Sequence, residues 1–385
     1  MSISASASHP VSGLDWRLGG TSGIRPGPQN SIVDVAGIRV GHAARAADGW
    51  LTGVSVVAAP GGARAAVDVR GGGAATRETA ALDPTGVVER IHAVALTGGS
   101  AFGLEASAGV MAALRERGLG FRVGVDPRAV VPIVPAAAIF DLGRGGVFEN
   151  HPDAALGRQA AEDALSDGTG APVQGSVGAG IGAIAGEMRG GVGTASAVLP
   201  GGVVVAALVV VNADGTTVDP RSGILWGAFA ELPLSDGGGE FGIRPPSAAE
   251  HAAARARLGW EAERRPALRP LNTTLAVVAT DAGLHRAELA RLASASHDGM
   301  ARAIRPVHTL GDGDVVFALS AGDGALPDPA PGLHAEHAHS DAVNQVLTAG
   351  ADVVTRAIVH AVLSVSTAHG AAGVVPSYRD LYGQR

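Results

Sequence analysis

The chain has 385 residues, 46% of them hydrophobic, with a formal net charge of −7 at pH 7. It contains no cysteine, which excludes disulfides, thiolate catalysis, iron–sulfur clusters and cysteine-ligated zinc. All 29 basic residues are arginine, so a P-loop lysine, a pyridoxal Schiff base and a Ser–Lys dyad are excluded as well.

Charge and hydropathy also bear on partners and location. No run of basic residues indicates binding to nucleic acid, and no basic amphipathic stretch indicates a membrane surface. The first residues lack the basic and apolar regions of a secretory signal, and the longest apolar run, at 201–211, is too short to span a bilayer. We therefore expect a soluble, cytoplasmic protein.

The first half of the chain alternates predicted strands and helices. Residues 1–30 are rich in Ser, Gly and Pro and are expected to form a flexible leader. Gly-punctuated alternation of apolar and polar residues is typical of half-buried strands, and a proline in the first turn is typical of a helix. These patterns predict strands within 31–43, 52–72 and 91–97, a turn at Gly98–Ser100, a helix at 102–117, an irregular strand within 129–143 and a helix at 151–165.

The second half has a glycine loop at 175–186 and then the same alternation. Residues 237–270 are Arg-rich and flanked by Gly and Pro, which predicts an exposed linker with one short helix. Strands are predicted at 201–215, 273–281 and 312–320, and helices at 285–304 and 341–366. Gly-rich strand pairs follow one another directly, which favours helices packed over two sheets rather than a doubly wound parallel sheet.

Two patterns suggest functions that the sequence does not support. The stretch "GAGIGA" at 178–183 resembles a dinucleotide fingerprint but ends in Ala183 and lacks the acidic residue that such sites place about twenty positions later. Its backbone N–H groups could still bind an oxyanion. His334, His337 and His339 lie in a Pro/Gly-rich segment without a ligand spacing, so we expect a solvated loop and no metal.

Polar residues at strand ends are better candidates. Asp312 and Asp314 are two apart where a strand begins, so both carboxylates would face one spot and could tune one catalytic group. The alternative is a plain Gly/Asp turn. Asn212 closes the strand at 201–215, where it would either cap a turn or stabilise an oxyanion with its amide N–H₂.

The segment "LNTTLAVVATD" at 271–281 places two hydroxyls at the start of a strand. Threonine is an ordinary strand residue, and an internal threonine is a poor nucleophile because no base removes its proton. A threonine at a chain terminus has its own base, the α-amine. Cleavage after Asn272, performed by the Thr273 hydroxyl through an N→O acyl shift, would create such a residue.

The chain resembles the N-terminal-nucleophile hydrolases that comprise β-peptidyl aminopeptidases, L-aminopeptidase/D-amidases and nylon-oligomer (6-aminohexanoate-oligomer) hydrolases. The resemblance extends from about residue 30 to 366. It rests on ordered blocks that include "LTGGSAFGLEASAGV", "SVGAGIGA", "VVVNADG", "NTTLAVVATDA", "HDGMARAIRPVHT" and "DGDVVFALS". Asn-Thr followed by Asp-x-Asp is more similar to the nylon-oligomer hydrolase branch, because the aminopeptidase branch tends to have Ser and Ser-x-Glu.

The resemblance implies a role for each matching residue. Thr273 corresponds to the nucleophile freed by cleavage after Asn272, Asp312 and Asp314 to the carboxylates that hold it, and Asn212 to the oxyanion-hole asparagine.

The chain departs from the family pattern at two places. The family often has a lysine after the glycine loop, where this chain has Glu187 or Arg189. It also often has a tyrosine where Phe140 precedes Asp141. In the family both residues lie near the nucleophile, so the resemblance implies that these departures bear on the self-cleavage rate and on the choice of substrate.

The resemblance further implies an α+β fold, a four-layer αββα sandwich processed into an α subunit (31–272) and a β subunit (273–385). This heterodimer would assemble into a larger homo-oligomer and hydrolyse a small amide, a peptide or a polyamide oligomer through an acyl-enzyme, without cofactor or metal. Two alternatives remain open: an acyltransferase with a self-cleaving threonine, and an aminopeptidase acting on small N-terminal residues.

Overall fold

The computed structural model describes residues 23–383 except 167, 169, 235–236, 265–270, 328–334 and 372. Its main strands are β1 (Arg39–Arg45), β2 (Thr52–Val69), β3 (Ala75–Arg77), β4 (Ile91–Thr97), β7 (Ala136–Ala138), β10 (Val192–Val198), β11 (Val204–Asn212), β12 (Thr273–Ala282) and β13 (Val315–Gly324). Its helices are α1 (Ser100–Gly103), α2 (Ala106–Glu116), α3 (Ala154–Ala164), α4 (Ala248–Ala262), α5 (Arg286–Ala303), α6 (Ala335–Leu363) and α7 (Tyr378–Tyr382). Short hairpins are β5–β6 (Phe121–Arg122, Val130–Val131), β8–β9 (Ile184–Ala185, Met188–Arg189) and β14–β15 (Ala368–Gly370, Gly373–Val375).

The long strand β2 belongs to two sheets. Residues 54–58 pair with β4, and residues 64–69 pair with β13, with a register shift between Ala58 and Ala63. Sheet A therefore has the order β10-β11-β12-β13-β2, and sheet B combines β1, β2, β4, β7 and β3. The chain joins the two sheets by bending one strand.

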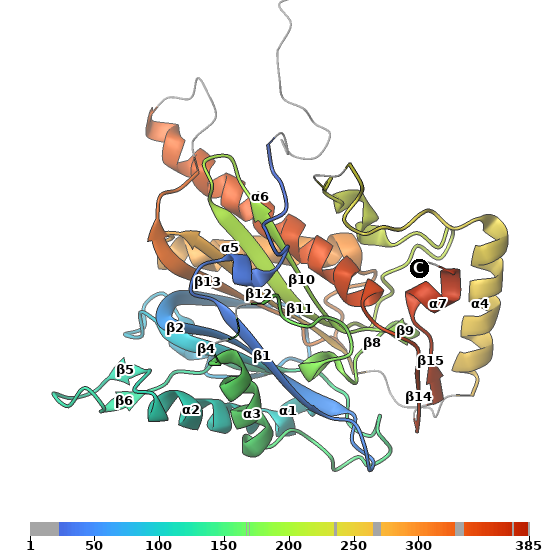
Figure 1. Ribbon diagram of the computed structural model, residues 1–385, viewed down its shortest axis with the longest axis horizontal. Coiled ribbons are helices and arrows are strands. Elements are labelled where there is room, and N and C mark those ends of the chain that lie inside the picture. Colours follow the sequence, from blue (N-terminus) through green and yellow to red (C-terminus); the bar gives the residue numbers. More distant parts are fainter. Residues whose placement is uncertain are drawn as a thin grey trace, which may run out of the picture.

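Three apolar clusters fill the spaces between four layers. Alternate residues of β11, β12 and β13, such as Leu208, Val277 and Phe317, meet Val57 and Leu96 of sheet B in the central core. The opposite face of sheet A packs on α5 and α6, and the outer face of sheet B packs on α2 and α3. Figure 1 shows α5 and α6 on one side of the sheets and α2 and α3 on the other. The predicted αββα sandwich is confirmed.

The helix α6 is the one described helix that is long and apolar enough to cross a membrane, and 78% of its apolar window is buried within the protein. Small residues allow this close packing: a Cβ on Gly193 of β10 would lie 2.1 Å from the Ala357 carbonyl oxygen. The helix thus covers sheet A as a core element.

Several predicted boundaries differ from the structure. The helix predicted at 102–117 is divided into α1 and α2. The helix predicted at 341–366 begins at Ala335, so the loop predicted around His337 and His339 is wrong. His337 and His339 are exposed and Ala338 is half-buried, as expected for the first turns of a helix at the surface. His334 lies outside the described residues.

The described residues that precede β1 pack against sheet A through backbone hydrogen bonds. Within the predicted leader at 1–30, residues 1–22 lie outside the described part. The backbone of Arg25 exchanges two hydrogen bonds with Val198 of β10. In the predicted linker at 237–270, α4 packs against α7, and both lie at one edge of the molecule beside β14 and β15 (Figure 1).

Candidate active site

Thr273 is the first residue of β12, which lies between β11 and β13 in sheet A. It pairs directly with Asn212, the last residue of β11. Directly opposed residues of an antiparallel pair project from the same face. Side chains alternate along β12 and Leu275 lies in the central core, so Thr273 and Asn212 both face the space between the sheets.

The Asn272–Thr273 peptide is closely surrounded. The Thr273 hydroxyl donates to the carbonyl oxygen of Asn272 at 2.5 Å, and the Gly313 N–H donates to the same oxygen at 2.9 Å. Thr273 is only 4% exposed. The nucleophile predicted from the sequence thus lies beside the carbonyl that it would have to attack, and that carbonyl is already polarised by a backbone donor.

Asp314 holds the backbone just beyond Thr273. One carboxylate oxygen accepts the Thr274 N–H at 2.6 Å. The other accepts the His308 N–H at 3.1 Å and lies 2.8 Å from the His308 Nδ1. His308 has φ 58°, a left-handed conformation that is uncommon outside glycine. The carboxylate therefore connects the strand β12 with the loop that precedes β13.

Asp312 holds a second backbone segment. Its carboxylate accepts N–H groups from Asp214 at 3.2 Å and from Thr309 at 3.1 Å. Burial raises the pKa of Asp312, and the nearby Asp314 raises it further. The structure brings both predicted aspartates to the start of β12 and β13. Within the described residues, their hydrogen bonds go to the surrounding backbone and to the His308 imidazole, and not to the Thr273 hydroxyl.

The Asn212 amide has a defined orientation. Its carbonyl oxygen accepts from Arg144 Nη1 at 2.5 Å and from the Ile184 N–H at 3.1 Å. Two donors on one oxygen identify the other amide atom as nitrogen. That nitrogen donates to the Phe140 carbonyl at 3.3 Å, and its second N–H has no partner among the described residues.

Asp141 lies buried behind this group. Desolvation raises its pKa to about 6, although the Gly99 N–H, which donates at 2.7 Å, and the positive charge of Arg144 act in the opposite direction. Phe140 contributes its backbone carbonyl to the site.

A cavity of about 130 Å³ lies next to Asn212. Arg144 and Arg189 line it, whereas Glu187 is exposed at the turn between β8 and β9. Of the two residues that the sequence offered in place of the family lysine, the structure brings Arg189 into the site.

Sequence reasoning missed Arg144, His308 and Gly313. Arg144 and His308 are isolated polar residues in loops, and no periodic pattern marks them. Their partners lie 68 residues away for Arg144 and six residues away for His308. Gly313 could have been predicted from the segment "DGD", since a glycine between the two aspartates allows the backbone to approach Thr273 closely.

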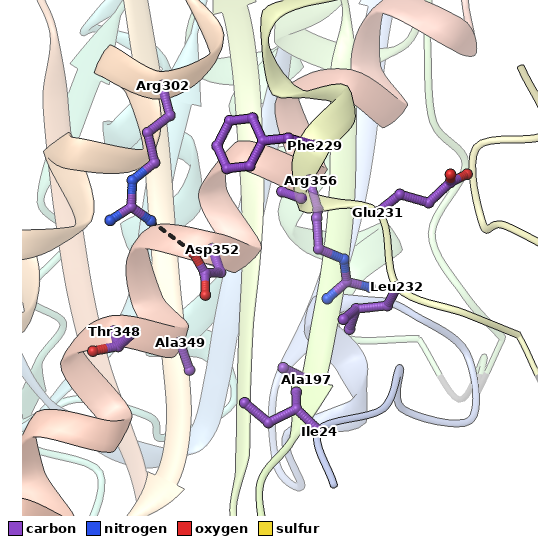
Figure 2. Close-up of a pocket in the computed structure, with 11 residues that line it drawn as sticks. Ile24, Ala197, Phe229, Glu231, Leu232, Arg302, Thr348, Ala349, Asp352 and Arg356 are labelled. Atoms are coloured by element: carbon purple, nitrogen blue, oxygen red, sulfur yellow. Dashed lines mark hydrogen bonds and ion pairs between the residues drawn. The ribbon is translucent and has the colours of Figure 1, made fainter. Parts of the chain in front are cut away.

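A second cavity, of about 180 Å³, lies between η4 (Trp226–Ala230), α5, α6 and β10. Figure 2 shows its lining, with the Arg302–Asp352 ion pair of 2.6 Å on one side and Phe229 nearby. Ala197 in its wall is level with Thr280, so this wall lies at the opposite end of β12 from Thr273.

Solved structures of known proteins share this architecture. The β-aminopeptidase of Burkholderia sp. matches with a TM-score of 0.66 and 23% identity, covering 94% of this chain and 96% of that one. The L-aminopeptidase D-Ala-esterase/amidase of Ochrobactrum anthropi, described as a variant of the Ntn hydrolase fold, matches with a TM-score of 0.62 and 21% identity, covering 94% and 96%. The fold is therefore that of an N-terminal-nucleophile hydrolase.

Sequence relatives identify the family. The chain belongs to peptidase family S58, whose model matches residues 30–375. An uncharacterized aminopeptidase of Mycobacterium tuberculosis is 45% identical over 359 residues, covering 92% of this chain and 98% of the relative. The 6-aminohexanoate-oligomer endohydrolase of Paenarthrobacter ureafaciens is 34% identical over 299 residues, covering 76% of each chain.

These matches confirm the predicted family and show a hydrolase that acts on amide bonds. The predicted closer similarity to the nylon-oligomer branch is not confirmed, because relatives named as aminopeptidases have the higher identity.

Proposed function

We propose that the protein is a self-cleaving amide hydrolase whose nucleophile is Thr273, released as a new N-terminus by scission of the Asn272–Thr273 bond. The observation that carries the proposal is the position of the Thr273 hydroxyl, 2.5 Å from the Asn272 carbonyl oxygen, with the Gly313 N–H on the same oxygen. A hydroxyl beside a polarised carbonyl is the arrangement that an N→O acyl shift requires.

In the proposed processing step, Thr273 Oγ forms a bond to the Asn272 carbonyl carbon, and the Gly313 N–H stabilises the developing oxyanion. The C–N bond then breaks, the nitrogen takes the hydroxyl proton, and an ester joins the two segments. Water hydrolyses this ester, which leaves a carboxylate on Asn272 and a free amine on Thr273.

In the proposed catalytic cycle, the Thr273 amine accepts the Oγ proton while Oγ attacks the substrate carbonyl. The Asn212 amide N–H₂, which faces the same space between the sheets, stabilises the oxyanion. The amine then protonates the leaving nitrogen, and water releases the acyl group. Asp312 and Asp314 keep the flanking backbone in place.

Names of relatives bear on the substrate. One group is named as aminopeptidases and another as 6-aminohexanoate-oligomer endohydrolases. Both names describe hydrolysis of an amide bond between amino-acid units. We propose a substrate of that class, either a short peptide or an oligoamide, and side-by-side assays of short peptides, β-peptides and 6-aminohexanoate oligomers would rank them.

Replacement of Thr273 tests the proposal. Purified wild-type protein should consist of fragments of roughly 27 and roughly 11 kDa, the 38.1 kDa chain divided by length at residue 272. Thr273→Ala should remain one intact chain without amidase activity, as read by intact-mass spectrometry and an amide-hydrolysis assay. Thr273→Ser, which keeps a hydroxyl, should still be cleaved.

Thr274→Val is the matched control. The Thr274 hydroxyl is buried and has no hydrogen-bond partner among the described residues, and valine has nearly the same shape. This variant should be processed and active. A Thr273→Ala chain that is still cut after Asn272 and still hydrolyses amides would contradict the proposed mechanism.

A further inference from the structure

The cavity beside Asn212 is unusually positive for a space inside a protein. Its charged lining residues are Arg144 and Arg189, which are 7% and 3% exposed, and no Asp or Glu lines it in the part of the chain that the structure describes. Buried charges are normally paired, because the loss of hydration is costly. Here, neither arginine forms an ion pair with a described residue.

The guanidinium groups are held by neutral oxygens. Arg144 Nη1 donates to the Gly182 carbonyl at 2.7 Å as well as to Asn212, and Arg189 Nη2 donates to Ser176 Oγ at 2.9 Å and to the Ile181 carbonyl at 2.8 Å. Arg189 Nε is buried without a hydrogen-bond partner among the described residues. These contacts orient both guanidinium groups without neutralising them. The buried Asp141 carboxylate offsets part of the Arg144 charge, and none of the described carboxylates acts in this way on Arg189.

Both arginines are affected by this environment. Desolvation lowers the pKa of each to about 10. For Arg144 the negative charge of Asp141 opposes this shift, and the positive charge of Arg189 adds to it. Both groups nevertheless remain charged at neutral pH, since these values lie well above 7. An anion bound between them would offset the repulsion and the lost hydration together.

A short chain of contacts leads from the cavity to the proposed nucleophile. Arg144 contacts Asn212, and Asn212 lies directly opposite Thr273 in the sheet. Opposed Cβ atoms in antiparallel strands are about 5 Å apart, so the Asn212 side chain alone links the Arg144 guanidinium to the strand position opposite the nucleophile. A substrate that reaches from Thr273 into the cavity needs only a short spacer.

We propose that this cavity binds the terminal carboxylate of a short amide substrate and so places the amide bond near that terminus at Thr273. The inference rests on the proposed function and adds the substrate's charge and length. Arginine presents paired N–H donors that match the geometry of a carboxylate. A volume of about 130 Å³ is small compared with ordinary ligand pockets of about 300–1,000 Å³, so the site suits one small terminal residue.

Binding to the uncut Thr273→Ala chain tests the inference without hydrolysis. Isothermal titration calorimetry would compare N-acetylglycine, which has a free carboxylate, with N-acetylglycinamide, which is neutral and of nearly the same shape. The acid should bind at least about tenfold more tightly than the amide, because only the acid supplies the anion. Equal binding of the two compounds, or no binding of the acid, would overturn the inference.

Variants assign the effect to the cavity. In the Thr273→Ala background, Arg189→Met should abolish the preference for the acid, and Arg189→Lys, which keeps the charge but not the fork of donors, should retain part of it. Arg115→Met is the matched control, since Arg115 is exposed on α2 on the outer side of sheet B, and it should keep the full preference. Circular dichroism would verify that each variant is folded.

Hydrolysis by the wild-type protein gives a second readout. A dipeptide and its C-terminal amide should differ in KM rather than in kcat, because the carboxylate lies away from the reacting bond. Failure of the proposed function would appear as an uncut wild-type chain, whatever the titrations show. Failure of this inference would appear as a processed, active enzyme that treats acid and amide alike.

Discussion

Gly313 shows how little space remains around the proposed scissile bond. A Cβ at this position would lie 2.6 Å from Thr273 Oγ1 and 3.0 Å from the Ala74 Cα. The first distance is far shorter than a normal contact, and the backbone on the other side cannot easily move. A side chain here would displace the hydroxyl, the Gly313 N–H donor or both.

Gly313→Ala should therefore slow self-cleavage by at least about a hundredfold, comparable to the loss of an oxyanion donor. The measurement is the time course of intact and cleaved chain after expression, followed by mass spectrometry. Gly61→Ala provides the control, because nothing lies within 4 Å of its added methyl group. Unchanged processing of Gly313→Ala would show that this glycine does not set the geometry of the bond.

At the residue scale, the candidate site residues that can be predicted from the sequence are those that lie at the ends of predicted strands. Asn272, Thr273 and Asn212 are at strand ends, and register alone then brings Thr273 opposite Asn212. Asp312 and Asp314 also lie near Thr273, but their carboxylates hold separate backbone segments. The contacts of Arg144 and His308 depend on how loops fold against the sheets, and no periodicity in the sequence encodes that.

At the scale of elements, close helix packing depends on glycines whose added methyl groups would collide with backbone. Gly299 lies in α5, where a Cβ would be 2.2 Å from the Ala351 carbonyl oxygen of α6. Gly259 lies in α4 with nothing within 4 Å of its added methyl group, and it is exposed. The same substitution at these two positions should have opposite effects.

Gly299→Ala should destabilise the protein by about 1–3 kcal/mol, because overpacking a core exceeds the gain in helix propensity. Gly259→Ala should be neutral or stabilise by up to about 1 kcal/mol. Urea unfolding followed by circular dichroism measures both. A stabilising Gly299→Ala would indicate that α5 and α6 do not approach as closely as the structure has them.

The elements themselves were largely predictable where hydrophobic periodicity is strong. The strands β11 and β12 and the helix α5 fall within or next to the predicted ranges, since their apolar residues recur with strand or helix spacing. The helix α6 begins six residues before the predicted start, because its first turns carry His and Glu rather than an apolar face. The division between α1 and α2 has no clear local signal.

For the whole molecule, one buried ion pair joins the two sides of the proposed cut. Arg356 of α6 contacts both carboxylate oxygens of Glu240 at 2.5 and 2.6 Å, and it also donates to Asn30 at 2.7 Å. The side chains of Arg356 and Glu240 are each 1% exposed. Burial opposes the ionisation of Glu240, but hydrogen bonds from Arg356 and His360 outweigh it and hold its pKa at about 2.

Glu240→Gln should cost about 3–5 kcal/mol at pH 7, because it leaves the Arg356 guanidinium buried without its ion-pair partner. The pKa of Glu240 is lower in the folded state than its ordinary 4.5. Its ionisation therefore stabilises the fold above pH 4.5, and this contribution is lost as the pH falls toward 2. The stability difference between wild type and variant should shrink over that interval.

Guanidinium denaturation at a series of pH values measures this difference. Glu250→Gln is the control, since Glu250 pairs with Arg244 at the surface and should contribute little. A difference that stays constant from pH 7 to pH 2 would contradict the assignment of the stabilising charge to Glu240.

Strand β12 has a neighbour on each side, and this arrangement governs the behaviour of a chain end created there. Chain ends ordinarily fray, because few contacts restrain them. A new N-terminus at Thr273 would instead be held by the pairing of β12 with β11 and β13 and by the hydrogen bond from the Thr274 N–H to the Asp314 carboxylate. Its amine would therefore have little conformational freedom, so the nucleophile and its base would already be positioned before a substrate binds.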